Sequence, residues 1–261
     1  MNPALIEALK KLRLSGMLQS LEVRLQEATA NRLTHSEFLE LIVQDELAVR
    51  YDRGVERRTR AARFRDQKLL DDFDWDFNPG IRRKPLFDLA AGEFVRRHTD
   101  VLFFGPPGTG KSHCAQGVGA ALIRAGYSVY YRSIFDAVRD LLHDEAFDNH
   151  ERVMARYLSP DLLILDDMGI KHLPKRSGEF LFEIIMRRHE LKSTLMTSNR
   201  PREDWGKLLG DVPAATAILD RFLQSAQIIE FQGRSYRLKR RNEDQKPGQK
   251  SEDTPSEDTG E

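Results

Sequence analysis

The chain has 261 residues, 40% of them hydrophobic, and its 41 lysines and arginines balance its 41 aspartates and glutamates. This length predicts one or two folded domains, and the zero net charge by itself indicates nothing about partners. No apolar run approaches the ~20 residues of a membrane span, and the N-terminus lacks the apolar core of a signal peptide. We therefore expect a cytoplasmic protein with no membrane partner. The single cysteine, Cys114, excludes an intramolecular disulfide and a cysteine-based zinc site, and we expect it to be a buried apolar side chain.

Residues 3–66 predict three or four helices. Leu5, Leu9 and Leu12 recur at helical spacing, so we expect them on one apolar face. Thr34-His-Ser-Glu37 fits a capping box, in which the threonine and the glutamate satisfy each other's backbone N–H groups at the start of a helix. These patterns predict an all-α N-terminal domain over residues 1–69.

Four arginines recur at steps of three and four residues in the last predicted helix of this domain: Arg50, Arg53, Arg57 and Arg60. Such a stripe would face DNA phosphates and give sequence-independent, salt-sensitive binding. The alternative is a solvated face neutralised by neighbouring acids. Between residues 53 and 65 the only acid is Glu56, so we favour phosphate contact.

An aromatic linker follows, in which Phe73, Trp75 and Phe77 alternate with aspartates. Because these carboxylates would repel a phosphate backbone, we expect the aromatic rings to pin the linker to a neighbouring domain, with stacking on a nucleotide as the alternative. Pro79-Gly80 then interrupts the chain, and residues 81–97 predict one helix leading into a strand. We expect a second domain over residues 70–241, beginning with this linker.

The apolar run at 101–104 predicts a buried strand, and it is followed by a glycine-rich loop and a predicted helix over 112–124. The loop reads G-P-P-G-T-G-K-S and fits the phosphate-binding pattern G-x-x-x-x-G-K-[ST]. Its curled backbone would point N–H groups at phosphates, Lys111 would place a cation on the β- and γ-phosphates, and Ser112 would offer a hydroxyl to Mg²⁺. The expected nucleotide contacts are Gly105, Pro106, Pro107, Gly108, Thr109, Gly110, Lys111, Ser112 and His113. The loop therefore predicts binding of a nucleoside triphosphate with Mg²⁺, and a chance glycine turn is the alternative.

The next predicted strands cover 127–131 and 162–167, and two helices lie between them, over 133–144 and 151–157. The second of these strands ends in a pair of carboxylates. We assign Asp166 to Mg²⁺, together with Ser112, and Asp167 to activation of the attacking water. The alternative is an acidic turn with no chemical role.

A basic loop, a helix over 177–191 and a strand over 193–197 complete the predicted site. Asn199 follows this strand, where its amide could donate to the γ-phosphate and accept from the attacking water. A helix over 215–223 and a strand over 228–231 come next. Further candidate DNA contacts are Arg152, Arg156, Lys171, Lys175 and Arg176, although the three in the basic loop could equally be exposed without a partner. Residues 242–261 contain no aliphatic or aromatic side chain, which predicts a disordered acidic tail.

With these motifs in place, the second domain resembles an AAA+ ATPase, and the extra helix before the third strand is similar to the initiator and helicase-loader branch. Four segments resemble the IstB-like ATP-binding proteins: G-P-P-G-T-G-K-S, L-L-I-L-D-D-M-G, T-S-N-R-P and G-R-S-Y-R. These proteins are transposition helpers of insertion sequences, related to the helicase loader DnaC. N-terminal segments at 12–17, 37–41, 63–65 and 72–76 also look like this family, so the resemblance covers residues 5–240.

The resemblance implies an α/β fold, a P-loop AAA+ parallel sheet sandwiched by helices. It also implies that Arg221 is a finger reaching a neighbouring subunit's γ-phosphate and that Arg237 senses the phosphate within its own subunit. Two features depart from the wider superfamily. Many AAA+ proteins carry Glu where this chain has Asp167, and the usual C-terminal helical lid is absent, because few foldable residues follow 231. A neighbouring subunit would then have to close the site.

We therefore expect a slow ATPase, stimulated by assembly and by DNA, that forms a ring or helical oligomer on duplex DNA and recruits a cognate transposase. The N-terminal domain would serve assembly and contact DNA or the transposase. The nearest alternative is a DnaC-like loader of a replicative helicase. A P-loop kinase acting on a small metabolite and a nucleotide-gated scaffold without hydrolysis are the other two.

Overall fold

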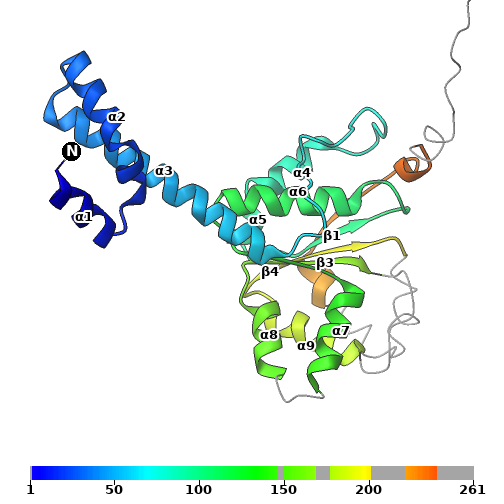
Figure 1. Ribbon diagram of the computed structural model, residues 1–261. Coiled ribbons are helices and arrows are strands. Elements are labelled where there is room, and N and C mark those ends of the chain that lie inside the picture. The colour runs from blue at the N-terminus through cyan, green and yellow to red at the C-terminus, as the bar shows by residue number, and fades with distance from the viewer. Residues whose placement is uncertain (1, 146–149, 169–176, 201–220, 240–261) are drawn as a thin grey trace, which may run out of the picture.

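A computed structural model of the chain describes residues 2–145, 150–168, 177–200 and 221–239. In these ranges a helical arm projects from an α/β domain (Figure 1). No helix in the described ranges is long and apolar enough to cross a membrane. The basic-loop candidates Lys171, Lys175 and Arg176, and the predicted tail over 242–261, lie outside the described residues.

The arm consists of α1 (Pro3–Lys11), α2 (Ser15–Asn31) and the first half of α3 (His35–Ala62), which confirms the expected helical region. The predicted capping box starts α3. Thr34 Oγ1 accepts a hydrogen bond from the backbone N–H of Glu37 at 3.3 Å, and the Glu37 carboxylate accepts one from the Thr34 N–H at 2.7 Å. Two N–H groups that an isolated helix would leave unpaired are therefore satisfied within four residues.

Helices α2 and α3 cross closely at Gly16. A Cβ at this position would lie 2.6 Å from the Cα of Glu46, so no larger side chain fits. The buried Glu46 carboxylate accepts hydrogen bonds from the N–H groups of Gly16 (2.6 Å) and Met17 (3.2 Å), at the beginning of α2. Arg50 pairs with the same carboxylate at 2.6 Å and holds the pKa of Glu46 below its usual value. One side chain of α3 thus caps α2.

The arm has a small core of its own, in which Leu9, Leu21 and Ile42 are buried. Of the three leucines at helical spacing only Leu9 is buried, because Leu5 and Leu12 are 44% and 66% exposed. Helix α1 packs mainly on α2, so only the centre of its apolar stripe is covered. The arm therefore leaves apolar side chains on its surface.

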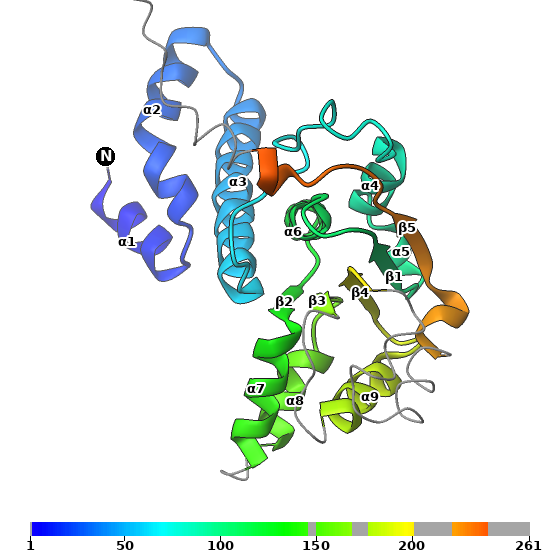
Figure 2. The same cartoon turned by 90° about the vertical axis from the view of Figure 1, so that its right-hand side faces the viewer.

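The α/β domain is built on a parallel sheet with the strand order β2-β3-β4-β1-β5 (Figure 2). The strands are β1 (Val101–Phe104), β2 (Val129–Ser133), β3 (Leu162–Met168), β4 (Ser193–Ser198) and β5 (Gln227–Glu230). The second strand begins two residues later than predicted, because Gly126, at φ +100°, and Tyr127 first close the preceding helix with hydrogen bonds back to it. The carboxyl ends of all five strands lie at one edge of the sheet.

Helices cover both faces of this sheet. On one face lie α4 (Arg83–Ala90), α5 (Glu93–Arg96) and α6 (Lys111–Arg124), and on the other α7 (Ile134–Glu145), α8 (His150–Leu158) and α9 (Ser177–Arg188). The single helix predicted over 81–97 is wrong, because Gly92 adopts φ +83° and divides it in two. The extra helix between β2 and β3 is confirmed as α8, and the α/β sandwich is the predicted fold class.

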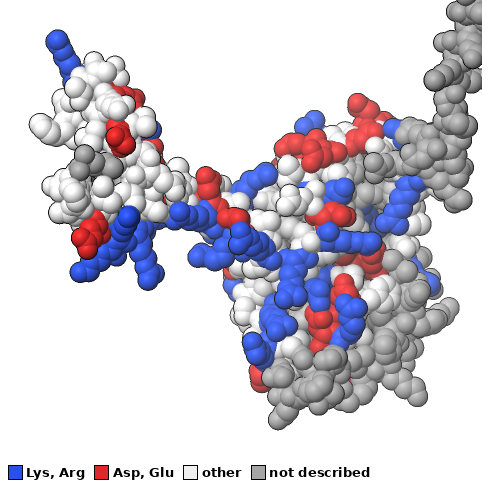
Figure 3. All heavy atoms as spheres, viewed as in Figure 1, with Lys and Arg blue, Asp and Glu red and all other residues white. Residues whose placement is uncertain are grey.

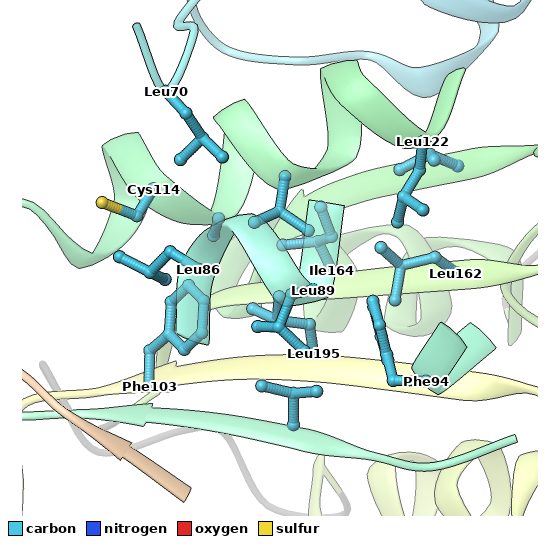
Figure 4. Packing of buried hydrophobic residues seen from close by; sticks show 14 of the residues in the cluster. Leu70, Leu86, Leu89, Phe94, Phe103, Cys114, Leu122, Leu162, Ile164 and Leu195 are labelled. Atoms are coloured by element: carbon cyan, nitrogen blue, oxygen red, sulfur yellow. The ribbon is translucent and has the colours of Figure 1, made fainter. Parts of the chain in front are cut away.

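The core on the α6 side joins helices to sheet. Leu86 and Leu89 of α4 pack with Cys114 and Leu122 of α6 against strand residues such as Phe103 (Figure 4). Cys114 is fully buried and burial raises the pKa of its thiol, which confirms its apolar role. A second core, on the α7–α9 face, contains the neighbouring strand residues, because side chains alternate between the two faces of a strand.

The C-terminal half of α3 belongs to this packing. Ala62 is fully buried in the α6-side core. The Tyr51 hydroxyl donates to the carbonyl of Arg124 at 2.9 Å, and Arg58 Nε donates to that of Ile123 at 3.2 Å, both at the end of α6. One continuous helix thus connects the arm to the sheet domain, and the domain boundary at residues 69/70 stays a prediction.

We expect Gly16→Ala to destabilise the arm by about 1–3 kcal/mol, because the added methyl group must push α2 away from α3. Hydrogen exchange should become faster in α1 and α2, and circular dichroism should show earlier loss of helix in urea. Asp52→Ala, at an exposed position of α3, is the control and should change stability by less than about 0.5 kcal/mol. Unchanged exchange in the Gly16→Ala arm would contradict the close crossing.

Candidate nucleotide-binding site

The phosphate-binding loop lies between β1 and α6, at the carboxyl edge of the sheet. Gly105 adopts φ +149°, and a Cβ there would lie 2.0 Å from the carbonyl oxygen of Phe231. Gly108 adopts φ +79°, and a Cβ would lie 2.1 Å from Ser235 Oγ. Both positions therefore require glycine, for the left-handed backbone and for the close approach of the chain that follows β5.

A cavity of about 770 Å³ opens beside this loop. The predicted catalytic residues Lys111, Asp166, Asp167, Asn199 and Arg237 all line it, as do the loop residues 107–113. Chain segments separated by more than a hundred residues in sequence thus meet around one space. Its size suits a nucleotide, since small-molecule pockets typically measure about 300–1,000 Å³.

Lys111 is buried, with its ammonium inside the loop. Its Nζ donates to the carbonyls of Gly105 and Pro106, at 2.7 Å each. Burial lowers its pKa to about 8, and the positive charge of Arg237 acts in the same direction, whereas Asp166 and Asp167 oppose the shift. The cation therefore lies where phosphate oxygens are expected.

Asp166 lies near the carboxyl end of β3 and accepts hydrogen bonds from three hydroxyl groups. Ser112 Oγ donates to its Oδ1 at 2.9 Å, Thr197 Oγ1 donates to the same oxygen, and the Tyr131 hydroxyl donates to Oδ2 at 2.5 Å. Carboxylate and hydroxyl oxygens are hard ligands of the kind that Mg²⁺ prefers. The residues present fit the predicted magnesium site, with Ser112 and Asp166 side by side.

Two of these three hydroxyl groups were missed by sequence reasoning. Thr197 lies only two residues before Asn199, so its position at the end of β4 was a usable signal. Tyr131 comes from β2, and only the pairing of β2 with β3 brings it next to Asp166.

Asp167 adopts a left-handed backbone conformation, φ +64°, which costs a non-glycine residue about 1–2 kcal/mol. Its N–H donates to Thr197 Oγ1 at 3.0 Å, which helps to fix this turn. Burial raises the pKa of the Asp167 carboxyl, and the charge of Asp166 raises it further. A carboxylate with a raised pKa is a better proton acceptor, as activation of water requires.

The Asn199 side chain carries a buried oxygen, Oδ1, with no hydrogen-bond partner among the described residues. The residue lines the cavity, next to Thr197 and Asp167. An unpaired buried acceptor typically costs about 1–3 kcal/mol, so such an atom indicates a place where a ligand or a water molecule supplies the donor. This geometry fits the role expected for Asn199.

The segment after β5, residues 231–239, runs back over the phosphate-binding loop; we call it the C-terminal arm. The N–H of Tyr236 donates to the carbonyl of Gly108 at 2.9 Å. The buried Asn78 holds Arg234 twice: its Nδ2 donates to the Arg234 carbonyl and its Oδ1 accepts from the Arg234 N–H, both at 2.9 Å. These bonds position Arg237 beside the cavity. The C-terminal arm contains one helical turn. The residues after 239 lie outside the described ranges, so the expected lack of a helical lid stays a prediction.

The aromatic linker packs against the same region, which confirms that its rings pin it to the domain. Phe73 contacts the ring of His113 edge-on, with centroids 5.3 Å apart, and Phe77 contacts Tyr236 in the same way at 5.1 Å. Trp75 packs near Phe87 of α4 at 6.0 Å. Phe73, Phe77 and His113 also line the cavity, and His113 Nε2 is hydrogen-bonded to the Leu69 carbonyl at 2.7 Å. The histidine therefore holds the linker.

Arg221, the residue expected to act on a neighbouring subunit, is exposed on a helical segment and is not among the residues lining its own cavity. Arg152 and Arg156 are exposed on α8. Their roles stay predictions.

The predicted basic stripe on α3 is exposed but partly paired. Arg50 pairs with Glu46 and Arg60 with Glu56, whereas Arg53 donates to Ser15 Oγ. Figure 3 shows basic side chains gathered along the lower side of the helical arm and, mixed with acidic ones, across the adjoining face of the α/β domain. Contact with DNA stays a prediction.

Comparison with known proteins agrees with this geometry. Residues 7–244 match the family described as IstB-like ATP binding protein. A protein of Pseudomonas aeruginosa named as an ATP-binding protein of insertion sequence IS21 is 35% identical over 231 residues, which are 88% of this chain and 87% of that protein. AMPPCP-bound DnaA from Aquifex aeolicus matches with a TM-score of 0.55 and 20% identity, over 70% of this chain and 55% of that one. The DnaC helicase loader matches with a TM-score of 0.50 and 22% identity, over 57% of this chain and 88% of that one. These structures confirm the AAA+ fold.

We expect Asn78→Ala to release the C-terminal arm, because it removes both hydrogen bonds to Arg234. Each such bond contributes about 0.5–1.5 kcal/mol. Because the variant no longer holds Arg237 beside the cavity, nucleotide affinity should fall about tenfold. Hydrogen exchange of residues 233–239 should become faster, and calorimetric titration with an ATP analogue should show the weaker binding. Asp76→Ala, at an exposed position of the same linker, is the control and should change neither. Unaltered hydrogen exchange of the C-terminal arm would contradict the role of Asn78.

Proposed function

We propose, from the premise that this chain belongs to the family of IstB-like ATP-binding proteins, that it is an AAA+ ATPase which assembles on duplex DNA and assists a transposase. The observation that carries the proposal is the cavity in which a buried lysine, two strand-end carboxylates and an unpaired asparagine oxygen converge. The insertion-sequence name of the Pseudomonas aeruginosa relative supports the transposition context.

Hydrolysis of ATP would use each residue in a distinct role. The N–H groups of the loop and Lys111 would bind the phosphates, while Ser112 and Asp166 would hold Mg²⁺. The metal would neutralise charge on the phosphate oxygens. Asp167 would accept a proton from the attacking water, and Asn199 Oδ1 would orient that water. Arg237 would add positive charge where the transition state spreads negative charge onto the phosphate oxygens.

The described subunit supports a site that is completed by a neighbour. In the described part of the chain, its C-terminal arm places a single helical turn beside the loop. Arg221 is exposed away from its own cavity, as a residue acting on the adjacent subunit must be. Assembly would therefore switch hydrolysis on.

Two surfaces of the helical arm fit the proposed partners. The basic stripe on α3 suits the phosphates of duplex DNA, and Arg57 has no ion pair among the described residues. Apolar side chains are exposed on the arm as well: Leu39, Val43 and Leu47 recur every four residues along α3 and are 59%, 37% and 56% exposed. A row of exposed apolar residues favours contact with another protein, either a neighbouring subunit or the transposase.

Mixing two inactive variants tests whether one subunit completes the ATPase site of its neighbour. Arg221→Ala should reduce turnover by about 1,000-fold or more, the scale of an arginine finger, and Lys111→Ala should abolish nucleotide binding. A mixture should recover activity, because the Lys111→Ala subunit still offers Arg221 to the intact pocket of the other. Arg139→Ala, exposed on α7, is the control and should turn over ATP at the normal rate.

Turnover should also rise with protein concentration and with duplex DNA. Full turnover by dilute protein without DNA would contradict the proposal and favour a metabolite kinase. Preferential binding to single strands and to a hexameric helicase would favour a helicase loader. Wild-type protein without any turnover would favour a nucleotide-gated scaffold.

We expect Arg57→Glu combined with Arg60→Glu to weaken duplex binding and to flatten the salt dependence of the affinity, because two phosphate contacts are lost. Affinity for an ATP analogue should not change. Lys84→Glu combined with Arg97→Glu makes the same change in net charge on the α4–α5 side and also breaks helical ion pairs, so it is the matched control. If duplex affinity depends on salt concentration equally steeply for the stripe variant and wild type, α3 is not part of the DNA-binding surface.

A further inference from the structure

The loop that joins α3 to the aromatic linker is held firmly against the nucleotide site. Helix α3 ends at Ala62, and the next residue, Arg63, adopts φ +55° and redirects the chain. The next residue, Phe64, packs against Tyr131, with ring centroids 6.0 Å apart, and so tightly over Gly119 that a Cβ there would lie 2.9 Å from its ring. Two residues further, the N–H of Asp66 donates to Gln116 Oε1 at 3.0 Å.

These anchors connect the loop to the magnesium side of the site. Tyr131 donates to Asp166, and the buried Gln116 donates from its Nε2 to the carbonyl of Ser112 at 3.2 Å. The residue between the two anchors, Arg65, is therefore fixed by its neighbours on both sides while its own side chain is exposed.

The guanidinium of Arg65 faces the cavity. Arg65 lines the same space as Lys111, Asp167 and Asn199. No hydrogen bond or ion pair of its side chain is present within the described residues, although acids are close enough to feel its charge. Its charge opposes the rise in the pKa of Asp167 and of Tyr131, both of which burial raises. A cation held beside the site without a partner is available to a bound anion.

We propose that Arg65 is a phosphate-binding residue of the ATPase site, supplied by the connection between the helical arm and the AAA+ domain. The inference rests on the proposed function and adds a contact to it. A planar guanidinium binds phosphate oxygens in a bidentate manner, as no other side chain does. Because Arg65 approaches from the side of Tyr131 and the acid pair, where Mg²⁺ and the terminal phosphates are expected, it should favour a triphosphate over a diphosphate.

This contact would link the orientation of the helical arm to whether the site holds a triphosphate or a diphosphate. Arg65 lies three residues beyond the end of α3, and α3 carries the basic stripe. Loss of the γ-phosphate would remove a restraint on the loop at the base of that helix. The alternative is that Arg65 extends the basic stripe and contacts DNA, which the test below separates.

The test compares full-length Arg65→Ala and Arg65→Lys with wild type, by calorimetric titration with AMPPCP and with ADP in the presence of Mg²⁺. We expect Arg65→Ala to bind AMPPCP about tenfold more weakly, near the lower limit for a lost hydrogen bond to a charged group, and ADP less than about threefold more weakly. The affinity of Arg65→Lys for AMPPCP should lie between those of wild type and Arg65→Ala, because lysine keeps the positive charge but lacks the planar guanidinium that binds two oxygens at once. Arg63→Ala, exposed in the same loop and absent from the cavity lining, is the matched control and should bind both nucleotides normally.

Two results would overturn the inference. Normal AMPPCP affinity with weakened duplex binding would assign Arg65 to the DNA surface, and an equal loss in Arg63→Ala would assign the effect to the shape of the loop. Thermal unfolding of every variant checks that the fold is kept. If wild type binds AMPPCP and Lys111→Ala does not, the nucleotide site of the proposed function is kept whatever Arg65 does. Wild type that binds no nucleotide would overturn both proposals.

Discussion

The carboxylate of Asp166 holds the site together. It is buried, and it accepts hydrogen bonds from three hydroxyl groups that belong to α6, β2 and β4. A buried charge is tolerated only when its oxygens are well satisfied, so these hydroxyl groups stabilise the carboxylate and are themselves positioned by it. The strand order β2-β3-β4-β1 places Asp166 between its two strand donors, with only β4 between its own strand and β1, the strand that leads into the phosphate-binding loop. The strand order of the sheet therefore also fixes the geometry of the site.

The opposite wall of the cavity is built differently. The aromatic linker and the C-terminal arm lie more than 150 residues apart in sequence, yet the two hydrogen bonds of Asn78 and the contact between Phe77 and Tyr236 join them over the loop. Neither segment is part of the sheet, but each is anchored by a buried residue, Asn78 in the first and Phe231 in the second. The acid pair is therefore positioned by strand pairing, whereas Arg237 is positioned by packing between two segments that are remote in sequence.

Helix α6 connects the nucleotide to the helical arm. Its first residue is Lys111, and the carbonyls at its other end accept hydrogen bonds from Tyr51 and Arg58 of α3. The helix has 14 residues, and a rigid helix of that length spans about 21 Å. The loop that contains Arg65 makes a second, shorter connection between the same parts. The nucleotide site and α3 are thus connected both through the C-terminal end of α6 and through its middle, where Gln116 lies.

The sequence by itself determined the features whose chemistry lies within a few consecutive residues. The phosphate-binding loop, the acid pair at 166–167 and the capping box at Thr34 were all predicted, because a local backbone shape and its side chains specify each of them. Only the tertiary structure decided which distant residues complete these features. Tyr131 beside Asp166, Asn78 around Arg234 and the exposure of Leu12 follow from strand pairing and from which helix covers which face. Packing between segments remote in sequence sets those neighbours, and no local pattern encodes it.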